Sequence, residues 1–283
     1  MTGRTRPIGV TGATGRLGGR IADRLAAHGI PQRLLVRDPS RAPQLPRATA
    51  VSAPYGEGDA VREGLTGIDT VLMVSAAETP DRVRQHQTFI DAAVAAGISH
   101  LVYISFYGAA PTATFTLARD HWATEQHIQR SGLSYTFLRD NLYADFLPQM
   151  VGDDGVIRGP GGTGRVAAVA QDDIADAAAA VLQDPAAHAG ATFELTGPEA
   201  LTLEEIVAAL SRVTGRNITY RDETLEEAYA SRAIFGAPDW QVDAWVSTYT
   251  AIADGSLAQV TDAIPDLTGH PATPLIEVCR RRS

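Results

Sequence analysis

A glycine-rich loop near the start of the chain limits the possible folds more than any other feature. The loop follows a short apolar run at residues 7–11 and precedes residues 16–28, in which Leu17, Ile21 and Leu25 recur at helical spacing. Glycines between a strand and a helix permit a tight turn, a close approach of the backbone to a pyrophosphate and close packing of the helix on the sheet. The loop therefore predicts a strand, a turn and a helix whose N-terminus binds the phosphates of a dinucleotide.

The alternation of apolar runs and helix-like segments continues along the chain. Each run has the length of a buried strand, and the segments between the runs are long enough for helices that cross back over the sheet. The expected strands lie at residues 34–36, 70–74, 101–104, 135–138 and 192–195, and the expected helices at 80–96, 116–130 and 174–182, with further helices beginning near Thr202, Thr224 and Asp239. The pattern predicts an α/β fold with a doubly wound, parallel Rossmann sheet covered on both faces.

Changes of composition divide the chain into two parts. The composition changes between residues 153 and 165, where Gly159, Pro160, Gly161 and Gly162 predict a loop, and helical patterns dominate after residue 197. We expect an NAD(P)-binding Rossmann domain of residues 1–152 and 166–197, and a smaller, mainly helical substrate lobe of residues 153–165 and 198–283. Because ligands of doubly wound sheets bind at the carboxyl ends of the strands, this lobe is expected to close over the cofactor.

The charge and hydropathy of the chain bear on its partners. The 283 residues carry a formal charge of −9, from 33 acidic and 24 basic side chains, with no block of like charges, which argues against nucleic acid or an anionic membrane as a partner. No apolar run approaches the roughly 20 residues that span a bilayer, and residues 1–7 lack the apolar stretch of a signal peptide. We therefore expect a cytoplasmic protein with a small-molecule substrate, and we leave homo-oligomerisation open.

All 24 basic side chains are arginine, because the sequence contains no lysine. Schiff-base chemistry, pyridoxal-phosphate attachment, a P-loop lysine and the Tyr-x-x-x-Lys pair of ordinary short-chain dehydrogenases all need the missing amine. The single cysteine, Cys279, lies in a polar C-terminal tail and excludes an intrachain disulfide and a cysteine zinc site. No two histidines show metal-ligand spacing, so we expect no metal.

The segment after the second expected strand bears on the choice of nicotinamide cofactor. An acidic residue at this place accepts hydrogen bonds from a free ribose 2′-hydroxyl, whereas an arginine pairs with a 2′-phosphate. Arg37 comes first and favours NADPH, while Asp38 would favour NADH if its carboxylate pointed to the ribose. The alternative for Arg37 is a solvated side chain without a ligand.

Five stretches of the chain resemble the NmrA-like atypical short-chain dehydrogenases and, within that family, the type 2 NAD(P)H:quinone oxidoreductases. The stretches are TGATGRLGG, LLVRDPSRA, VYIS, ARDHWATEQHIQRSGLSYTFLRDNLYADF and AAVAQDDIADAAAAVL, and the resemblance covers nearly the whole chain. It implies contacts with the pyrophosphate, the 2′-phosphate and the nicotinamide side of the cofactor. In chain order these residues are Gly12, Ala13, Thr14, Gly15, Arg16, Leu17, Arg37, Ser75, Ala76, Ala77, Ser105 and His121.

The resemblance also implies residues around the substrate. Phe106 and Tyr107, after the strand expected at residues 101–104, are expected beside the nicotinamide. Asn141, Tyr143 and Phe146 follow the strand expected at residues 135–138 and are candidates to line the pocket, although the two aromatic residues are equally candidates for the core.

Two residues are candidate catalysts. His121 lies four residues before Glu125, where many members of the family have a lysine near the nicotinamide ribose and the similar quinone reductases have a histidine. An imidazole with an unperturbed pKa near 6.5 could also deliver a proton, and Tyr107 could donate to a substrate oxygen. The alternatives are a structural histidine on the helix and a tyrosine that only packs.

Three functions are compatible with these residues. In the first, the chain is an NADPH-dependent oxidoreductase that passes a hydride to a quinone or related conjugated carbonyl, an acceptor electrophilic enough to need no Tyr-Lys pair. In the second, it is a non-catalytic NmrA-type regulator that senses NADP(H) and reports it to a protein partner. In the third, it reduces or isomerises a specialised metabolite. NADPH oxidation by a simple quinone would favour the first.

Overall fold

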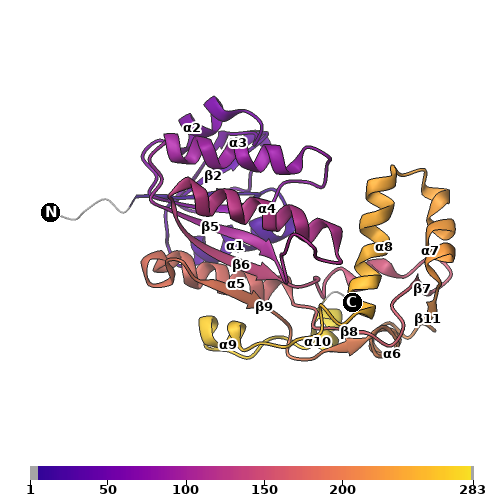
Figure 1. Ribbon diagram of the computed structural model, residues 1–283. Coiled ribbons are helices and arrows are strands. Elements are labelled where there is room, and N and C mark those ends of the chain that lie inside the picture. Colours follow the sequence, from indigo (N-terminus) through magenta and orange to yellow (C-terminus); the bar gives the residue numbers. More distant parts are fainter. Residues whose placement is uncertain (1–5, 282–283) are drawn as a thin grey trace. The chain divides into compact units, whose positions relative to one another are not determined.

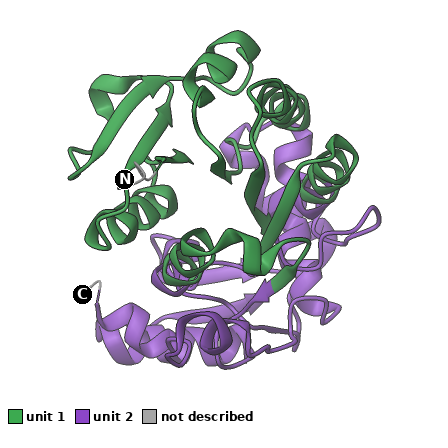
Figure 2. Cartoon of the chain, turned by 90° about the vertical axis from the view of Figure 1, so that its left-hand side faces the viewer, with its two compact units in different colours: residues 1–105, 120–139, 174–193 green, residues 106–119, 140–173, 194–283 purple. Residues whose placement is uncertain are grey.

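The chain is described by a computed structural model that covers residues 6–281. Residues 1–5, on which the expectation about a signal peptide partly rests, and residues 282–283 lie outside the described residues. The described chain divides into two compact units, which Figure 2 colours separately. Unit 1 comprises residues 6–105, 120–139 and 174–193, and unit 2 comprises residues 106–119, 140–173 and 194–281. The domain bounds expected from the sequence stay a prediction, because compactness alone does not show which segments fold independently.

A seven-stranded sheet forms the centre of unit 1, and Figure 1 shows its strands with the helices around them. The strands are β1 (Ile8–Thr11), β2 (Gln32–Val36), β3 (Ala48–Ser52), β4 (Thr70–Val74), β5 (His100–Phe106), β6 (Ser134–Asp140) and β9 (Thr192–Leu195). They lie in the order β3-β2-β1-β4-β5-β6-β9, and β1 pairs in parallel with both β2 and β4. The strand order reverses between β1 and β4, which is where ligands bind in such sheets. The predicted Rossmann sheet is confirmed.

Helices accompany the strands, and all of them except α2 lie where the sequence predicts a helix. They are α1 (Arg16–Ala27), α2 (Gly58–Leu65), α3 (Arg82–Ala95), α4 (Thr116–Ser131) and α5 (Gln171–Gln183), with short 3-10 turns η1 (Pro39–Arg41) and η3 (Pro185–His188). One apolar core packs α2, α3 and α4 on the sheet, through Val61, Phe89 and Ile128 against Met73 and Tyr103. This packing holds α3 and α4 in place, and both helices carry side chains of the candidate site.

Unit 2 holds the C-terminal helices and four short strands. The helices are α6 (Leu203–Thr214), α7 (Leu225–Arg232), α8 (Asp239–Ala253), α9 (Ala263–Thr268) and α10 (Leu275–Arg280), the strands β7 (Val156–Gly159), β8 (Arg165–Val166), β10 (Leu201–Thr202) and β11 (Thr219–Asp222), and the 3-10 turns η2 (Leu147–Met150) and η4 (Ala233–Phe235). Thr202 and Thr224 each form a capping box with the glutamate three residues on. These local bonds explain why the starts of α6 and α7 were predictable.

One expectation about unit 2 is wrong, and two short strand pairs in it were not expected. On either side of the predicted loop at residues 159–162, β7 pairs in parallel with β11, and β8 pairs with β10. Each strand is short and its partner lies far along the chain, so no local periodicity marks it. Cys279 does not lie in a polar tail, since it is 4% exposed on α10 within the core of unit 2.

The length and composition of the helices bear on whether one of them could span a membrane. Among residues 6–281, no helix combines the length and the apolar composition needed to cross a bilayer.

Candidate cofactor site

The loop after β1 has a backbone that only glycine allows. Gly12 has a φ of +67°, and a Cβ on Gly18 would lie 2.3 Å from the carbonyl oxygen of Gly12. Gly18 therefore lets α1 pack directly on the end of β1. Thr14, Gly15 and Arg16 are exposed, and the N-cap residue Gly15 has no side chain with which to satisfy the first N–H groups of α1. Exposed helix N–H groups and the positive end of the helix dipole fit a pyrophosphate.

The turn after β2 holds the two residues considered for the ribose, and it places their side chains differently. The Asp38 carboxylate accepts hydrogen bonds from the backbone N–H of Ser40 at 3.0 Å and from its hydroxyl at 2.7 Å, and so caps η1. These bonds lower the pKa of Asp38, and the bond from the Ser40 hydroxyl has the larger effect. Arg37 is exposed at the end of the strand next to β1. The carboxylate is thus engaged in its own turn, while the guanidinium extends into solvent and suits a 2′-phosphate.

Tyr55, which the sequence analysis did not identify, ties together the carboxyl ends of β1 and β4. The Val74 N–H donates to the hydroxyl oxygen of Thr11 at 2.8 Å, and the Tyr55 hydroxyl lies 2.5 Å from both that oxygen and the Val74 carbonyl. Burial raises the pKa of Tyr55, so the hydroxyl stays protonated. These bonds fix the two strand ends from which the loops at residues 12–17 and 75–77 begin.

The loop of Ser75, Ala76 and Ala77 is held from α3. The Ala76 N–H donates to Nε2 of His86 at 2.8 Å, and its carbonyl accepts from Nε of Arg82 at 3.1 Å. Both side chains are buried, with 0% and 5% of their surface exposed. Neither residue was predicted, and the available signal was a pair of polar residues four apart on a helix, which points them to one face.

His121 lies in a buried position on α4. Its Nε2 is 3.1 Å from Nη2 of Arg82, and its Nδ1 is 3.0 Å from the hydroxyl of Tyr103. The pKa of His121 lies well below the ordinary value. Burial is the largest cause, and the charge of Arg82 is the second. The expectation of an unperturbed pKa near 6.5 is therefore wrong, because the sequence reveals neither the burial of this ring nor the arginine beside it.

Ser105 is bound to a buried ion pair within unit 1. Its hydroxyl donates to Oε1 of Glu125 at 2.6 Å. Arg139 donates to both carboxylate oxygens of Glu125, from Nε at 2.8 Å and from Nη2 at 2.6 Å. The pair holds Ser105 in a fixed rotamer at the end of β5, and its contact with a cofactor stays a prediction.

Two predicted substrate residues, Phe106 and Tyr107, are buried in the core of unit 2. The ring of Phe106 packs against Phe115 with 4.7 Å between centroids. The backbone N–H of Tyr107 donates to the Asp140 carbonyl at 2.8 Å, and its hydroxyl lies 3.5 Å from Oε1 of Gln259. Burial raises the pKa of Tyr107, which makes it a weaker acid than a solvated tyrosine.

The other three predicted substrate residues differ in exposure. Asn141 is fully buried, and its amide donates to the Leu257 carbonyl at 3.0 Å, so its side chain has a structural role. The Tyr143 hydroxyl donates to Oδ2 of Asp140 at 3.0 Å. Phe146 is 52% exposed and is the one whose ring offers the most surface to a ligand.

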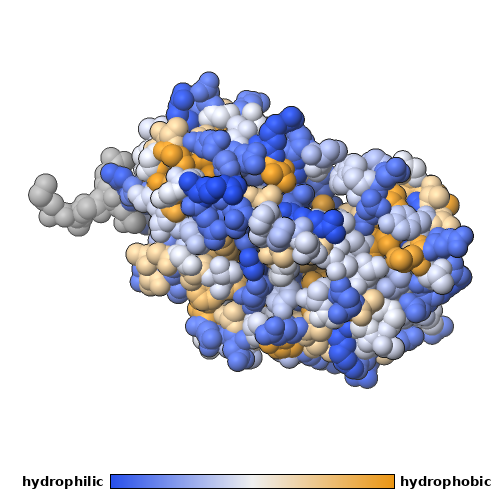
Figure 3. All heavy atoms as spheres, in the orientation of Figure 1, coloured by the Kyte–Doolittle hydropathy of each residue, from blue (hydrophilic) through white to orange (hydrophobic). Residues whose placement is uncertain are grey.

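Apolar side chains are exposed on α7 and η4, a region we call the α7–η4 surface. It consists of Leu225, Tyr229, Ile234 and Phe235, and Ile234 and Phe235 are 83% and 65% exposed. Figure 3 shows hydrophobic residues gathered over this part of unit 2. The ring of Phe235 meets Trp245 of α8 edge-on, at 5.8 Å. Exposed apolar residues in a group of this kind mark a binding surface more often than scattered ones do.

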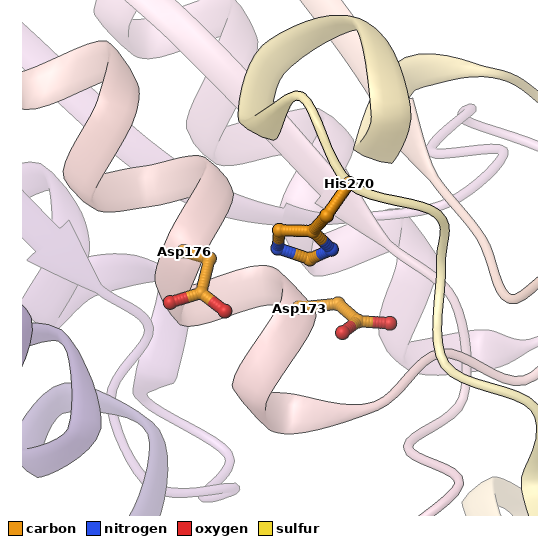
Figure 4. A group of neighbouring side chains, drawn as sticks. All are labelled: Asp173, Asp176 and His270. Carbon is orange, nitrogen blue, oxygen red and sulfur yellow. The ribbon is translucent and has the colours of Figure 1, made fainter.

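Figure 4 shows Asp173 and Asp176 on α5 and His270 on the segment after α9. Asp173 accepts from the Thr273 N–H at 2.6 Å and from its hydroxyl at 2.7 Å, so both of its oxygens are bonded within unit 2. Nδ1 of His270 donates to the carbonyl of Pro271 at 2.9 Å. Oδ1 of Asp176 accepts from Nε of Arg24 at 2.9 Å. Each of the three side chains thus has a bond within the protein, and we assign no metal to the group.

Comparisons with known proteins show the family to which the chain belongs. The profile of the NmrA-like family matches residues 4–245. The chain is 32% identical to quinone oxidoreductase 2 of Escherichia coli over 95% of this chain and 96% of that protein, and 32% identical to an NAD(P)H azoreductase of Xenophilus azovorans over 96% of each. A crystal structure of the E. coli NADPH-dependent quinone oxidoreductase with NADPH has a TM-score of 0.89, 32% identity and coverage of 97% of this chain and 99% of that one. The transcriptional regulator NmrA in complex with NADP, at 18% identity and a TM-score of 0.76, covers 98% of this chain and 95% of its own and shares the fold.

Proposed function

Because the chain belongs to the NmrA-like family, we propose that it is an NADPH-dependent oxidoreductase that transfers a hydride to a quinone or a related conjugated acceptor. NADPH, when bound, supplies the hydride from its nicotinamide ring. The observation that carries the proposal is the turn after β2, in which Asp38 is bonded to Ser40 while Arg37 is exposed. This turn suits a 2′-phosphate. One relative at 32% identity is named an NAD(P)H azoreductase, and the similar E. coli quinone oxidoreductase is described as NADPH-dependent and was crystallised with NADPH.

The residues of unit 1 have binding and orienting roles in this proposal. The N–H groups of residues 12–17 bind the pyrophosphate, and Arg37 pairs with the 2′-phosphate. The loop at residues 75–77 and Ser105 border the cofactor from the ends of β4 and β5. Their bonds to α3 and to Glu125 keep these backbone segments in one conformation, which lowers the entropic cost of binding.

The proton that completes quinone reduction comes from water in this proposal. A quinone that accepts a hydride becomes a hydroquinone anion, which takes up one proton. His121 is a poor source because it is neutral and both of its ring nitrogens already have partners. Tyr107 is a weak acid because burial raises its pKa. We therefore give His121 a positioning role in place of the expected proton delivery.

The acceptor is a conjugated, largely apolar molecule in this proposal. The relatives are named for a quinone and for an azo compound, both of which are conjugated electron acceptors. In unit 2, the half-buried Tyr143, the exposed Phe146 and the α7–η4 surface offer aromatic and aliphatic area suited to such a molecule. Tyr107 is kept as a candidate contact, whereas Phe106 and Asn141 support the unit from inside.

The remaining expectations belong to the same proposal. A cytoplasmic location fits a chain whose described helices include none that could cross a bilayer. Homo-oligomerisation stays a prediction. The regulator alternative has less support, because the likeness to NmrA is a likeness of fold at 18% identity. Reduction or isomerisation of a specialised metabolite also stays a prediction.

The test is a titration of the purified protein with NADPH and NADH, followed by absorbance at the nicotinamide band with simple quinones and an azo dye. We expect tighter binding of NADPH and oxidation that depends on the acceptor. An Arg37→Ala variant, which should retain oxidation of NADH, serves as the matched control for the cofactor assignment. Binding of NADPH without oxidation by any acceptor would contradict the proposal and direct the search to a protein partner.

A further inference from the structure

We propose that Arg82 is a positioning residue that holds the loop at residues 75–77 and fixes His121 as a neutral imidazole with its proton on Nδ1. The inference rests on the proposed function, which assigns that loop to the cofactor. Arg82 is 5% exposed; its Nε donates to the Ala76 carbonyl at 3.1 Å, and its Nη2 lies 3.1 Å from Nε2 of His121. Its Nη1 lies 3.8 Å from Oδ2 of Asp120, which balances the buried charge. One guanidinium thus joins the loop after β4 to α4.

The partners of His121 leave one tautomer. A guanidinium donates hydrogen bonds and cannot accept them, so Nε2 of His121 is the acceptor from Arg82. A neutral imidazole carries its proton on the other nitrogen, and Nδ1 therefore donates to the Tyr103 hydroxyl at 3.0 Å. Because the ring is buried, and because the positive charge of Arg82 opposes a second positive charge beside it, the pKa of His121 lies well below its ordinary value and the ring stays neutral.

His86, one turn further along α3, obeys the same logic. The Ala76 N–H donates to its Nε2, so its proton is also on Nδ1, which donates to the Thr124 hydroxyl oxygen at 2.8 Å. The Thr124 hydroxyl in turn donates a hydrogen bond to the carbonyl of Asp120 at 2.8 Å. Both backbone groups of Ala76 are therefore bonded to α3, through His86 and Arg82. These two bonds hold the backbone of Ala76 against α3.

A third buried histidine, His100, provides an internal reference. The Thr136 hydroxyl donates to the His188 carbonyl at 2.8 Å, so its oxygen accepts from Nε2 of His100 at 2.9 Å. The Ser134 hydroxyl lies 3.1 Å from Nδ1 and donates to it. His100 therefore carries its proton on Nε2, the opposite of His86 and His121.

The first measurement is a long-range proton–nitrogen NMR correlation of the full chain with 15N-labelled histidine at neutral pH, with and without NADPH. Single His→Gln variants assign the signals. We expect Nδ1–H for His86 and His121 and Nε2–H for His100. His121 with its proton on Nε2, or on both nitrogens, in the unmutated protein would overturn the proposal without any variant.

The second measurement uses Arg82→Lys, which keeps the charge but cannot fork between the Ala76 carbonyl and His121. We expect His121 to move to the Nε2–H form, His86 to keep its tautomer, and the Kd for NADPH to rise about tenfold through loss of a charge-assisted hydrogen bond. Arg84→Lys, on the same helix with a side chain 78% exposed, is the matched control and should change nothing. An Arg82→Lys protein with unchanged His121 and unchanged Kd would overturn the proposal.

A third variant separates Arg82 from the tyrosine that also contacts His121. Tyr103→Phe removes the acceptor of Nδ1 but leaves the donor to Nε2, so His121 should keep its proton on Nδ1. If Tyr103→Phe changes the tautomer and Arg82→Lys does not, Tyr103 sets it and the proposal is wrong. Both readouts are independent of quinone turnover, so a failure of the proposed reductase activity would be distinguishable.

Discussion

The two units of the molecule differ in the side chains that they offer near their candidate ligands: unit 1 buries polar groups, whereas unit 2 exposes apolar ones. Unit 1 places a connected set of buried polar groups behind the cofactor loop, with Arg82, His86 and His121 at 5%, 0% and 6% exposure. Unit 2 instead exposes apolar groups, with Ile234 and Phe235 at the end of the α7–η4 surface. Hydrogen bonds need fixed directions, whereas apolar contact needs only area. A rigid polar unit suits one cofactor, and an apolar surface can accommodate acceptors of different shape.

The largest expected effect comes from adding one methyl group in each unit. Gly18→Ala would put a Cβ 2.3 Å from the Gly12 carbonyl in unit 1, and Gly164→Ala would put one 2.0 Å from the Ile252 carbonyl in unit 2. Each should lower the free energy of unfolding by about 3 kcal/mol, measured in urea, because backbone must move. Only Gly18→Ala should also weaken NADPH binding by the folded protein. Equal loss of NADPH affinity in both variants would contradict the assignment of cofactor binding to unit 1 alone.

Removal of the guanidinium at the end of β2 should have the next largest effect. Arg37→Ala removes a charge-assisted contact worth about 1.5–3 kcal/mol, so the Kd for NADPH should rise about ten- to 150-fold while that for NADH stays the same. Calorimetric titration measures both constants. Arg41→Ala, a second exposed arginine in the same turn, is the control. A larger effect at Arg41 than at Arg37 would move the 2′-phosphate contact to Arg41.

The buried imidazoles of unit 1 should make stability depend on pH. Burial lowers the pKa of His86 to about 3, whereas in the unfolded chain it is near 6.5. Between these values the unfolded chain binds a proton that the folded chain does not, so stability falls as the pH drops below about 6.5, by about 1.4 kcal/mol per pH unit for this residue. Urea unfolding between pH 7 and pH 5 measures the slope.

A variant assigns this pH dependence to the buried ring. His86→Gln should flatten the slope, because glutamine does not titrate. A slope that survives in His86→Gln would show that other groups cause the acid sensitivity.

The smallest expected effect concerns the α7–η4 surface. Phe235→Ser should raise the KM for a quinone about fivefold through loss of apolar contact, with the Kd for NADPH and the stability unchanged because the ring is exposed. Val94→Ser, at an exposed apolar position of α3 in unit 1, is the control. An equal change in KM for both variants would mean that the α7–η4 surface has no special part in acceptor binding.

Local signals predicted much of the fold and the cofactor loop. The glycines at residues 12 and 18, the spacing of Leu17 and Ile21, and the capping boxes at Thr202 and Thr224 all act within a few residues along the chain. A turn, a helix start or an amphipathic face depends on such neighbours, so the sequence alone indicates it. The glycine loop that we propose for the pyrophosphate was predictable in the same way.

Contacts between segments that are far apart in the chain could not be predicted from the sequence. The partner of β7 is β11, about 60 residues away, and the partner of Arg82 is His121, 39 residues away. Nothing in the sequence near Asp38 showed that its carboxylate would bond to Ser40 and leave the ribose position to Arg37, although the two residues are close in the chain. The folded backbone determines which rotamer Asp38 adopts and which turn follows it.

The sequence by itself determined a dinucleotide-binding α/β fold without lysine chemistry, because backbone preference, periodicity and residue type are properties of short segments. Only the tertiary structure decided that His121 is a neutral, buried ring and that Arg82, His86 and Tyr55 hold the cofactor loops. The physical reason is that protonation and hydrogen bonding depend on loss of water and on the charges nearby, and folding brings both from segments that are remote in the chain.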